Sequence, residues 1–215
     1  MDEEISIINS NTRIENIKKF FTSNKKKLIT FFTIILILIF LFFDLNELKD
    51  RNRVELSSKY YDAIESYNNG KKERAKNILT KIILEEDVTY SPLALYFLID
   101  KKMLVSKELI NKNFDIIINE LDLEEEIKFL IIYKKALYNS EFSTENELID
   151  ILSPIINSKS IWKSHSLYLL GEFFMSKNEK KKAKEFYEII LRTENSNNKI
   201  IALTKKRIHN EFSEK

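Results

Sequence analysis

The chain has 215 residues, of which 35 are basic and 33 acidic, with two glycines, two prolines and no cysteine. This length suits one domain with a short additional segment. So few turn-forming residues argue against a β-sandwich, a barrel or a Gly-rich nucleotide loop. The missing cysteines exclude disulfides and Cys-ligated zinc, and a net charge of +2 with interspersed signs indicates no nucleic-acid footprint.

Residues 1–27 precede a long apolar stretch, and their second half has an amphipathic pattern. Lys18 and Lys19 lie beside four apolar side chains that share one helical face: Ile14, Ile17, Phe20 and Phe21. This pattern is typical of a short helix that lies on an anionic membrane surface, and an unstructured tail is the alternative.

Residues 28–43 read LITFFTIILILIFLFF and carry no charge. At about 1.5 Å per residue, this helix would span roughly 24 Å, slightly less than a hydrocarbon core of about 30 Å. The long side chains of Lys25, Lys26 and Lys27 can reach the nearby interface. A buried core helix is the alternative, although such a helix seldom lacks a polar stripe. We therefore expect a transmembrane helix over residues 28–43.

The flanking residues indicate that this helix is an uncleaved signal anchor with a cytoplasmic N-terminus. A cleaved signal peptide needs a small-x-small site, whereas Asp44 to Leu48 contain no small residue. Six basic residues precede the apolar segment and four follow it within sixteen residues, and three of the six abut it. The positive-inside rule then places residues 1–27 in the cytoplasm and residues 44–215 on the far side of the membrane.

We expect residues 44–55 to be a linker, and residues 56–215 contain an internal repeat. Four segments place apolar residues at offsets 0, 3, 4, 7 and 8, which is the buried stripe of an amphipathic helix. These four stripes begin at Ala75, Ile110, Leu148 and Ala183, with spacings of 35, 38 and 35 residues. Twelve residues before each start lies the position where the preceding helix would cross closely: Ala63, Leu98, Ala136 and Gly171.

Local signals support the same division into helices. Gly70 and Asn178 occupy equivalent places and both tolerate the left-handed backbone of a tight turn. Ser91-Pro92 and the capping-box pattern Thr144-x-x-Glu147 mark helix starts. Pro154 should kink or shorten the helix that contains it.

A period near 34 residues, two helices per unit and a small residue twelve before an Ala form the tetratricopeptide signature. We therefore expect an all-α fold in which the transmembrane helix precedes a tetratricopeptide-like α-solenoid of about four helix pairs. A generic helical bundle is the alternative. The region 199–214 should form a C-terminal capping helix whose inward residues are Ile200, Ile201, Leu203, Thr204 and Ile208.

In repeats of this kind the first helix of each pair lines a concave groove. Three residues before each crossing position lie Tyr60, Leu95, Tyr133 and Tyr168. Tyrosines there would stack on a bound segment and bond its backbone. The predicted protein-binding groove comprises seven residues: Tyr60, Tyr67, Tyr133, His165, Tyr168, Glu172 and Met175. The alternative is that the rings only pack between neighbouring repeats.

The sequence shows no motif of catalytic or metal chemistry. Neither His165 nor His209 lies in a metal or catalytic pattern, and no phosphate loop or nucleophile elbow is present. The run Glu124–Glu126 fits a helix start, where acids complement the macrodipole. We therefore expect no catalytic residue, no metal, no cofactor and no enzymatic activity.

The segment RIENIKKFFTSNKKKL at 13–28, the apolar span, Tyr61–Ile64 and the degenerate repeats together resemble the YfgM-like family. Members of this family are ancillary subunits of the bacterial SecYEG translocon. The resemblance covers nearly the whole chain, and IKKFF with the following Lys cluster is its most discriminating part. It implies an inner-membrane protein with a periplasmic domain, which contacts translocon subunits and a membrane-anchored chaperone of the prolyl-isomerase type. The high Lys, Asn and Ile content and Leu98 depart from the family pattern.

Two other functions remain open on the sequence. The same groove would serve a scaffold protein for envelope biogenesis or cell-division machinery. A membrane-bound enzyme or ligand sensor would need a pocket that no motif marks.

Overall fold

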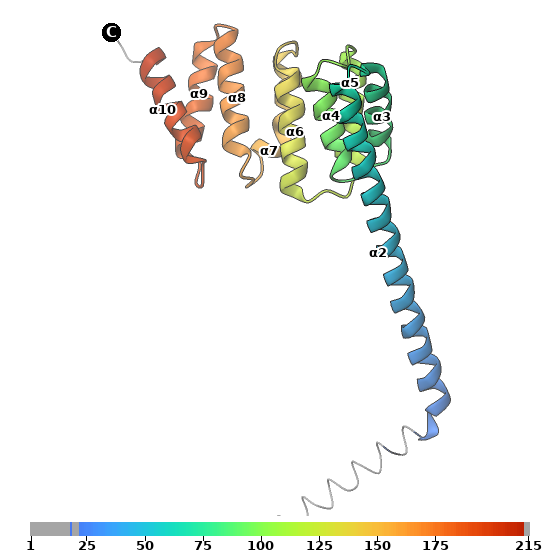
Figure 1. The fold of residues 1–215 in the computed structure, drawn as a ribbon. Coiled ribbons are helices and arrows are strands. Elements are labelled where there is room, and N and C mark those ends of the chain that lie inside the picture. The colour runs from blue at the N-terminus through green and yellow to red at the C-terminus, as the bar shows by residue number, and fades with distance from the viewer. Residues whose placement is uncertain (1–17, 19–21, 213–215) are drawn as a thin grey trace, which may run out of the picture. The chain divides into compact units, whose positions relative to one another are not determined.

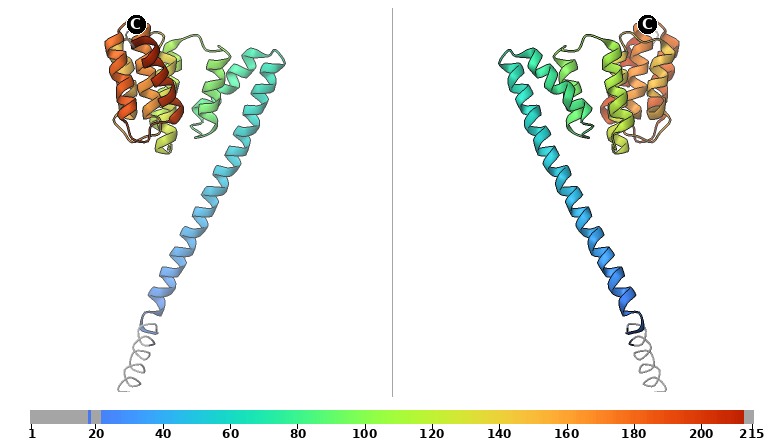
Figure 2. Two further views of the ribbon diagram at one scale, coloured as in Figure 1. Left: turned by 90° about the vertical axis from the view of Figure 1, so that its left-hand side faces the viewer. Right: turned by 90° about the vertical axis from the view of Figure 1, so that its right-hand side faces the viewer.

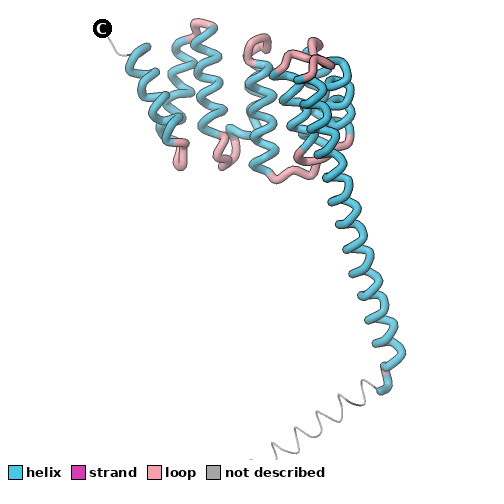
Figure 3. Tube along the Cα trace, viewed as in Figure 1, coloured by secondary structure: helices cyan, strands magenta, loops and turns pink. Residues whose placement is uncertain are grey.

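The computed structural model describes residue 18 and residues 22–212, except for the side chains of residues 28, 29 and 40–51. Every regular element among these residues is an α-helix, which confirms the all-α prediction for them (Figure 3). The chain divides between Glu55 and Leu56 into two compact units.

From Lys25 onward the first unit belongs to helix α2 (Lys25–Asn68), which continues into the second unit. Residues 44–55, expected as a linker, are helical. Seven large apolar side chains of α2 are between 47% and 60% exposed: Phe31, Phe32, Ile34, Leu36, Ile37, Leu38 and Ile39.

The membrane predictions fall partly outside the described residues. Among the residues that can be described, no helix has an apolar stretch long enough to cross a membrane. Within the segment 28–43, the side chains of residues 28, 29 and 40–43 lie outside that set. The interfacial helix expected over residues 13–21 lies outside it too, apart from Lys18.

The second unit is a row of antiparallel helices that begins with the C-terminal part of α2 (Figures 1 and 2). The helices that follow are α3 (Lys72–Leu84), α4 (Tyr90–Asp100), α5 (Lys107–Glu120), α6 (Glu125–Asn139), α7 (Glu145–Ile156), α8 (Lys163–Ser176), α9 (Lys180–Arg192) and α10 (Asn198–Phe212). From α3 onward successive helices are neighbours, and α10 packs on both α9 and α8. This is the packing of a helical repeat.

Because the helices alternate in direction, their connections gather at two ends of the unit. The α2–α3, α4–α5, α6–α7 and α8–α9 turns lie at one end, and the remaining loops lie at the other (Figure 3). Turns that are far apart in the sequence therefore become spatial neighbours.

The four apolar stripes form the core of the second unit. Of their twenty side chains, Leu191 is the only exposed one, at 41%, and the others are buried or partly buried. Even the polar exception, Asn113, is only 4% exposed. Burying such side chains stabilises a fold by about 1.5–3 kcal/mol each, so these stripes account for the register of the helices.

The crossing positions are buried as expected, and Gly171 shows why a small residue is needed. The ring of Tyr187 on α9 lies where a side chain of residue 171 would be. A Cβ added to Gly171 would lie 2.8 Å from Cδ1 and 2.9 Å from Cζ of that ring. Tyr187 is itself completely buried, so moving its ring would disturb the neighbouring core side chains.

The turns after α2 and α8 have the expected left-handed residue, with φ of 77° at Gly70 and 62° at Asn178. After Gly70, the Lys71 N–H donates to the Ser66 carbonyl at 2.8 Å. After Asn178, the Glu179 N–H donates to the Phe174 carbonyl at 2.9 Å. This pattern satisfies carbonyls at the helix end that have no partner within the helix.

The capping box predicted for α7 is present. The Thr144 N–H donates to Glu147 Oε2 at 2.8 Å, and the Glu147 N–H donates to Thr144 Oγ1 at 3.4 Å. Pro154 lies near the end of α7, which stops two residues later, at Ile156.

The N-cap predicted at Ser91 is wrong. Helix α4 begins at Tyr90, and Asp87 Oδ1 accepts hydrogen bonds from the backbone N–H groups of Thr89 and Tyr90 at 2.9 and 2.7 Å. Ser91 is buried instead, and its hydroxyl donates to the Ile82 carbonyl at 2.9 Å. A carboxylate three residues before Tyr90 thus satisfies the first N–H groups of the helix.

Helix α10 covers the last pair with fewer side chains than expected. Ile200 and Thr204 are buried, and Ile201 and Ile208 are partly buried. Leu203 was expected to face the stack and is 38% exposed, because at one residue before Thr204 it falls about 100° away around the helix.

Candidate protein-binding site

The four tyrosines of the predicted groove lie on first helices and are partly buried. Tyr60 on α2 contacts the Tyr90 ring with centroids 5.8 Å apart. Tyr168 on α8 contacts the Tyr187 ring, also at 5.8 Å. Burial raises the pKa of the Tyr60 and Tyr168 hydroxyls. These rings therefore pack against neighbouring helices and keep only part of their surface for a ligand.

Other predicted groove residues also pack against the fold. The position between the tyrosines, Leu95, is completely buried, so the row is interrupted there. Tyr67 meets Phe97 edge to face at 5.3 Å. Met175 is partly buried against the core of the second unit.

Tyr133 and His165 belong to one aromatic cluster together with Trp162. The Tyr133 ring stacks on the Trp162 ring at 5.7 Å with 24° between their planes, and His165 lies 5.1 Å from Trp162. Burial lowers the pKa of His165, and the nearby backbone of Ile161 partly offsets this effect. An imidazole with a lowered pKa is uncharged at neutral pH, so His165 adds no positive charge to the aromatic cluster.

Glu172 was expected to flank the groove, and the structure places it in an internal network. Its Oε1 accepts hydrogen bonds from the Tyr187 hydroxyl at 2.7 Å and from Arg207 Nε at 2.9 Å. Its Oε2 forms a second hydrogen bond with Arg207. The Arg207 guanidinium is the main cause of the lowered pKa of Glu172. The carboxylate thus joins α8 to α9 and α10, and its bonding capacity is largely used.

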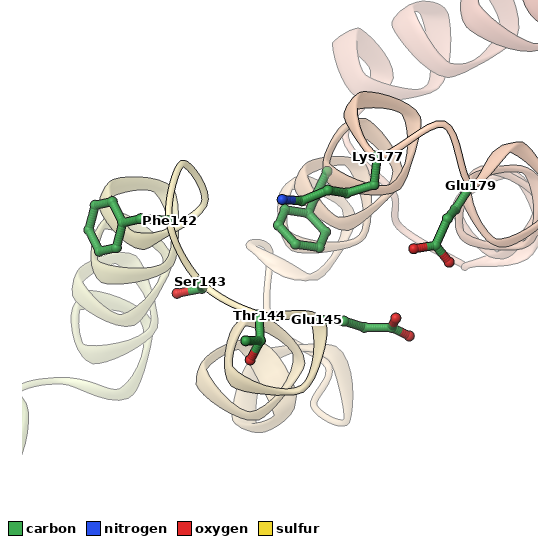
Figure 4. Close-up of a pocket in the computed structure, with 7 residues that line it drawn as sticks. Phe142, Ser143, Thr144, Glu145, Lys177 and Glu179 are labelled. Atoms are coloured by element: carbon green, nitrogen blue, oxygen red, sulfur yellow. The ribbon is translucent and has the colours of Figure 1, made fainter.

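A pocket of about 410 Å³ opens at the end of the second unit where the α6–α7 and α8–α9 turns lie (Figure 4). One wall is the run Phe142, Ser143, Thr144 and Glu145, and the other is formed by Phe173, Lys177 and Glu179. Both walls come from turns at the same end of successive helix pairs, so the repeat itself brings them together.

A lysine lies over each of the two phenylalanine rings, and of these two lysines Lys177 lines the pocket. Lys107 Nζ lies 3.8 Å from the centroid of Phe142, and Lys177 Nζ lies 5.4 Å from that of Phe173. The two acidic residues of the wall share a different lysine: Lys182 Nζ is 2.8 Å from carboxylate oxygens of both Glu145 and Glu179. In Figure 4 the Phe142 ring points away from Lys177, and Phe173 is only 5% exposed, so polar and charged side chains form most of the accessible lining.

Sequence reasoning missed this pocket, although one signal was available. Phe142 and Lys177 both lie six residues after a crossing position, Ala136 and Gly171 respectively. Aligning the repeats by those positions would have placed the two side chains on equivalent turns. Within the described part of the chain, no group of three His, Cys, Asp or Glu side chains is arranged to hold a metal ion.

Comparisons of the chain with protein-family models, with curated proteins and with solved structures each find no match. The functional argument therefore depends on the residues and contacts described above.

Proposed function

We propose that the chain is a membrane-anchored protein-binding adaptor of the bacterial inner membrane. Residues 28–43 cross the membrane once with the N-terminus in the cytoplasm, and the helical-repeat unit is a tetratricopeptide-like domain in the periplasm. By its resemblance to the YfgM-like family, its partners are subunits of the Sec translocon and a membrane-anchored periplasmic chaperone.

The proposal depends mainly on one observation: α2 exposes large apolar side chains between Phe31 and Ile39, and the same chain continues into a helical repeat. The large apolar side chains between Phe31 and Ile39 are about half exposed. Contact of apolar surface with water costs roughly 25 cal/mol per Å². A hydrocarbon environment removes that cost. Patches of this kind mark a membrane or protein contact in a stable protein.

The second unit supports the binding role. Stacked helix pairs expose side chains of successive first helices on one extended surface. Tyr133 and Trp162 leave part of an aromatic cluster exposed there, and Leu137 on α6 is 44% exposed. Aromatic side chains with partial exposure are frequent anchors of protein interfaces.

Affinity purification of the full-length chain from membranes in mild detergent tests the proposal. Translocon subunits and a periplasmic chaperone should co-elute with the full chain and should be absent with a control chain that ends at Glu55. Recovery of envelope-biogenesis or division proteins in their place would replace the translocon role with the scaffold role. Equal recovery by the truncated control would place binding on the anchor and refute the adaptor role of the repeat unit.

A further inference from the structure

We propose that the surface of α8 and α9 that α10 covers is a binding site for an amphipathic helix of a partner protein, and that α10 occupies this site until such a helix replaces it. The replacing helix carries an arginine three residues after an aliphatic side chain. This inference rests on the proposed protein-binding function and gives it a site and a ligand class. Helix α10 is the last of the row and packs on both α9 and α8 (Figure 1).

This surface recognises a guanidinium group. Glu172 on α8 accepts a hydrogen bond from Arg207 Nε at 2.9 Å through Oε1, and its Oε2 bonds a second nitrogen of the same guanidinium. The Tyr187 hydroxyl on α9 donates to Glu172 Oε1 at 2.7 Å and orients the carboxylate. A lysine ammonium cannot reproduce this two-point contact. A helix that binds here therefore needs an arginine at the place that Arg207 takes in α10.

Three residues before Arg207, α10 presents a poorly matched side chain to the unit. Thr204 is completely buried, and its hydroxyl has no hydrogen-bond partner. Such a hydroxyl loses the hydrogen bonds that it would make to water, and a methyl group in its place avoids this cost. A helix with an aliphatic side chain at the place of Thr204 should therefore bind the surface more tightly than α10 does.

The other contacts of α10 are few and mostly near solvent. Ile200 is its only other buried side chain, and Ile208 and Phe212 are partly buried. The ion pair of Lys180 with Glu211, at 3.4 Å, joins side chains that are 51% and 32% exposed, and exposed pairs of this kind add little stability. These contacts leave α10 open to replacement by a better-matched helix.

Helix α10 also contains its own N-terminal cap. Asn197 Oδ1 accepts hydrogen bonds from the backbone N–H groups of Lys199 and Ile200 at 3.0 and 3.3 Å. These N–H groups keep their partner when the helix moves away, because the cap belongs to the same segment. Separation of α10 from α8 and α9 therefore leaves its first turn satisfied.

A fluorescein-labelled peptide of residues 198–212 probes this surface in the full-length chain. The chain in detergent is titrated into the peptide, and binding is followed by fluorescence polarisation. The peptide must compete with α10 of the same chain, so its apparent affinity depends on the fraction of molecules in which α10 is displaced. A change that weakens only the internal contact should tighten peptide binding, and a change in the peptide should act in the opposite direction.

Substitutions of Arg207 separate these two effects. Arg207→Met in the protein should tighten binding of the unsubstituted peptide about fivefold, which corresponds to about 1 kcal/mol. The same substitution in the peptide should weaken binding about fivefold, and Arg207→Lys in the peptide should weaken it equally. The matched control Lys206→Met in the protein alters an exposed residue of the same helix and should leave binding unchanged. The fluorescence of Trp162 checks that each variant is folded.

The peptide with Thr204→Val tests the second feature of the ligand. Removing the unpaired hydroxyl should make this peptide bind at least about fivefold more tightly than the unsubstituted one. Failure of every peptide to bind, an affinity that Arg207→Met in the protein leaves unchanged, or a Thr204→Val peptide that binds no better would overturn the inference.

A second copy of the chain is the alternative occupant of this surface. Sedimentation of the full chain in detergent should show a monomer with and without the peptide. A dimer that the peptide dissociates would assign the surface to that dimer, and the inference would be wrong.

The proposed adaptor function has a separate readout, the recovery of partners in affinity purification. If partners are recovered and the peptide does not compete with α10, this site is wrong while the adaptor role stands. If the peptide competes as described and no partner is recovered, the site stands while the adaptor role fails.

Discussion

Gly171 has no side chain, and this absence allows α8 and α9 of the last helix pair to pack closely. The completely buried Tyr187 ring lies against its Cα, and the Tyr187 hydroxyl is held by Glu172 at 2.7 Å. The Tyr187 ring is therefore held by its contact with Gly171 and by the hydrogen bond of its hydroxyl to Glu172. An added methyl group would have to displace it.

Replacing Gly171 by Ala sets two effects of opposite sign against each other. Higher helix propensity would stabilise the protein by about 1 kcal/mol, whereas overpacking in a core costs about 1–3 kcal/mol. Since the new Cβ would lie 2.8 Å from Tyr187 Cδ1, we expect overpacking to win by about 1 kcal/mol. Urea unfolding followed by the fluorescence of Trp162 measures this, because the chain has one tryptophan and it lies in the second unit.

A double-mutant cycle is the control for this contact. In a Tyr187→Leu background the ring is gone, so Gly171→Ala should become neutral or stabilising. If Gly171→Ala stabilises the protein that retains Tyr187, the close contact described here is incorrect.

Helix α10 illustrates how an element with a small apolar face is held in place. Ile200 and Thr204 are its buried side chains, and the Thr204 hydroxyl has no hydrogen-bond partner. Contacts with charged groups compensate in part: Arg207 pairs with Glu172, and Lys180 pairs with Glu211 at 3.4 Å. The attachment of this helix should therefore depend on charge and on pH.

Arg207→Met removes the charge and keeps much of the side chain. We expect the free energy of unfolding to fall by about 1 kcal/mol at neutral pH, a low value for a charged hydrogen bond because the Arg207 side chain is 39% exposed. Arg207 lowers the pKa of Glu172 in the folded state, so the pair stabilises the fold above the usual carboxyl pKa of 4.5. That stabilisation is lost as the pH falls below 4.5.

The measurement compares the unfolding free energies of Arg207→Met and the unsubstituted chain at neutral pH and below pH 4.5. The difference between the two proteins should shrink on acidification. Lys206→Met, an exposed change on the same helix, should show no such difference at either pH. A difference that persists unchanged in acid would mean that the ion pair with Glu172 is not what Arg207 contributes to stability.

At the scale of the whole molecule, periodic features were predictable from the sequence and single contacts were not. The apolar stripes predicted the helices and their register, because burying a whole helix face outweighs the secondary-structure preference of any one residue. The crossing residue Gly171 was recognisable by its size, but its partner was not, since the Tyr187 ring arrives from another helix. Ser91 failed as an N-cap because a nearby carboxylate, Asp87, competes for the same N–H groups.

The candidate site was harder to predict for the same reason. Tyr60, Tyr133 and Tyr168 were placed correctly on first helices, yet their exposure depends on ring contacts that spacing alone does not reveal. Glu172 is partnered by Arg207, 35 residues away. The pocket at the α6–α7 and α8–α9 turns arises only when successive helix pairs stack.

In the proposed topology, residues 28–43 cross a membrane and the helical-repeat unit lies on the far side from the N-terminus. The chain has no cysteine, so single cysteines introduced at Ser10 and at the exposed Lys184 are unique labels. Intact spheroplasts are treated with a membrane-impermeant maleimide, and labelling is repeated after permeabilisation. With this topology, we expect Lys184→Cys to label in intact spheroplasts and Ser10→Cys to label only after permeabilisation. Labelling of Ser10→Cys in intact spheroplasts, or protection of Lys184→Cys, would contradict it.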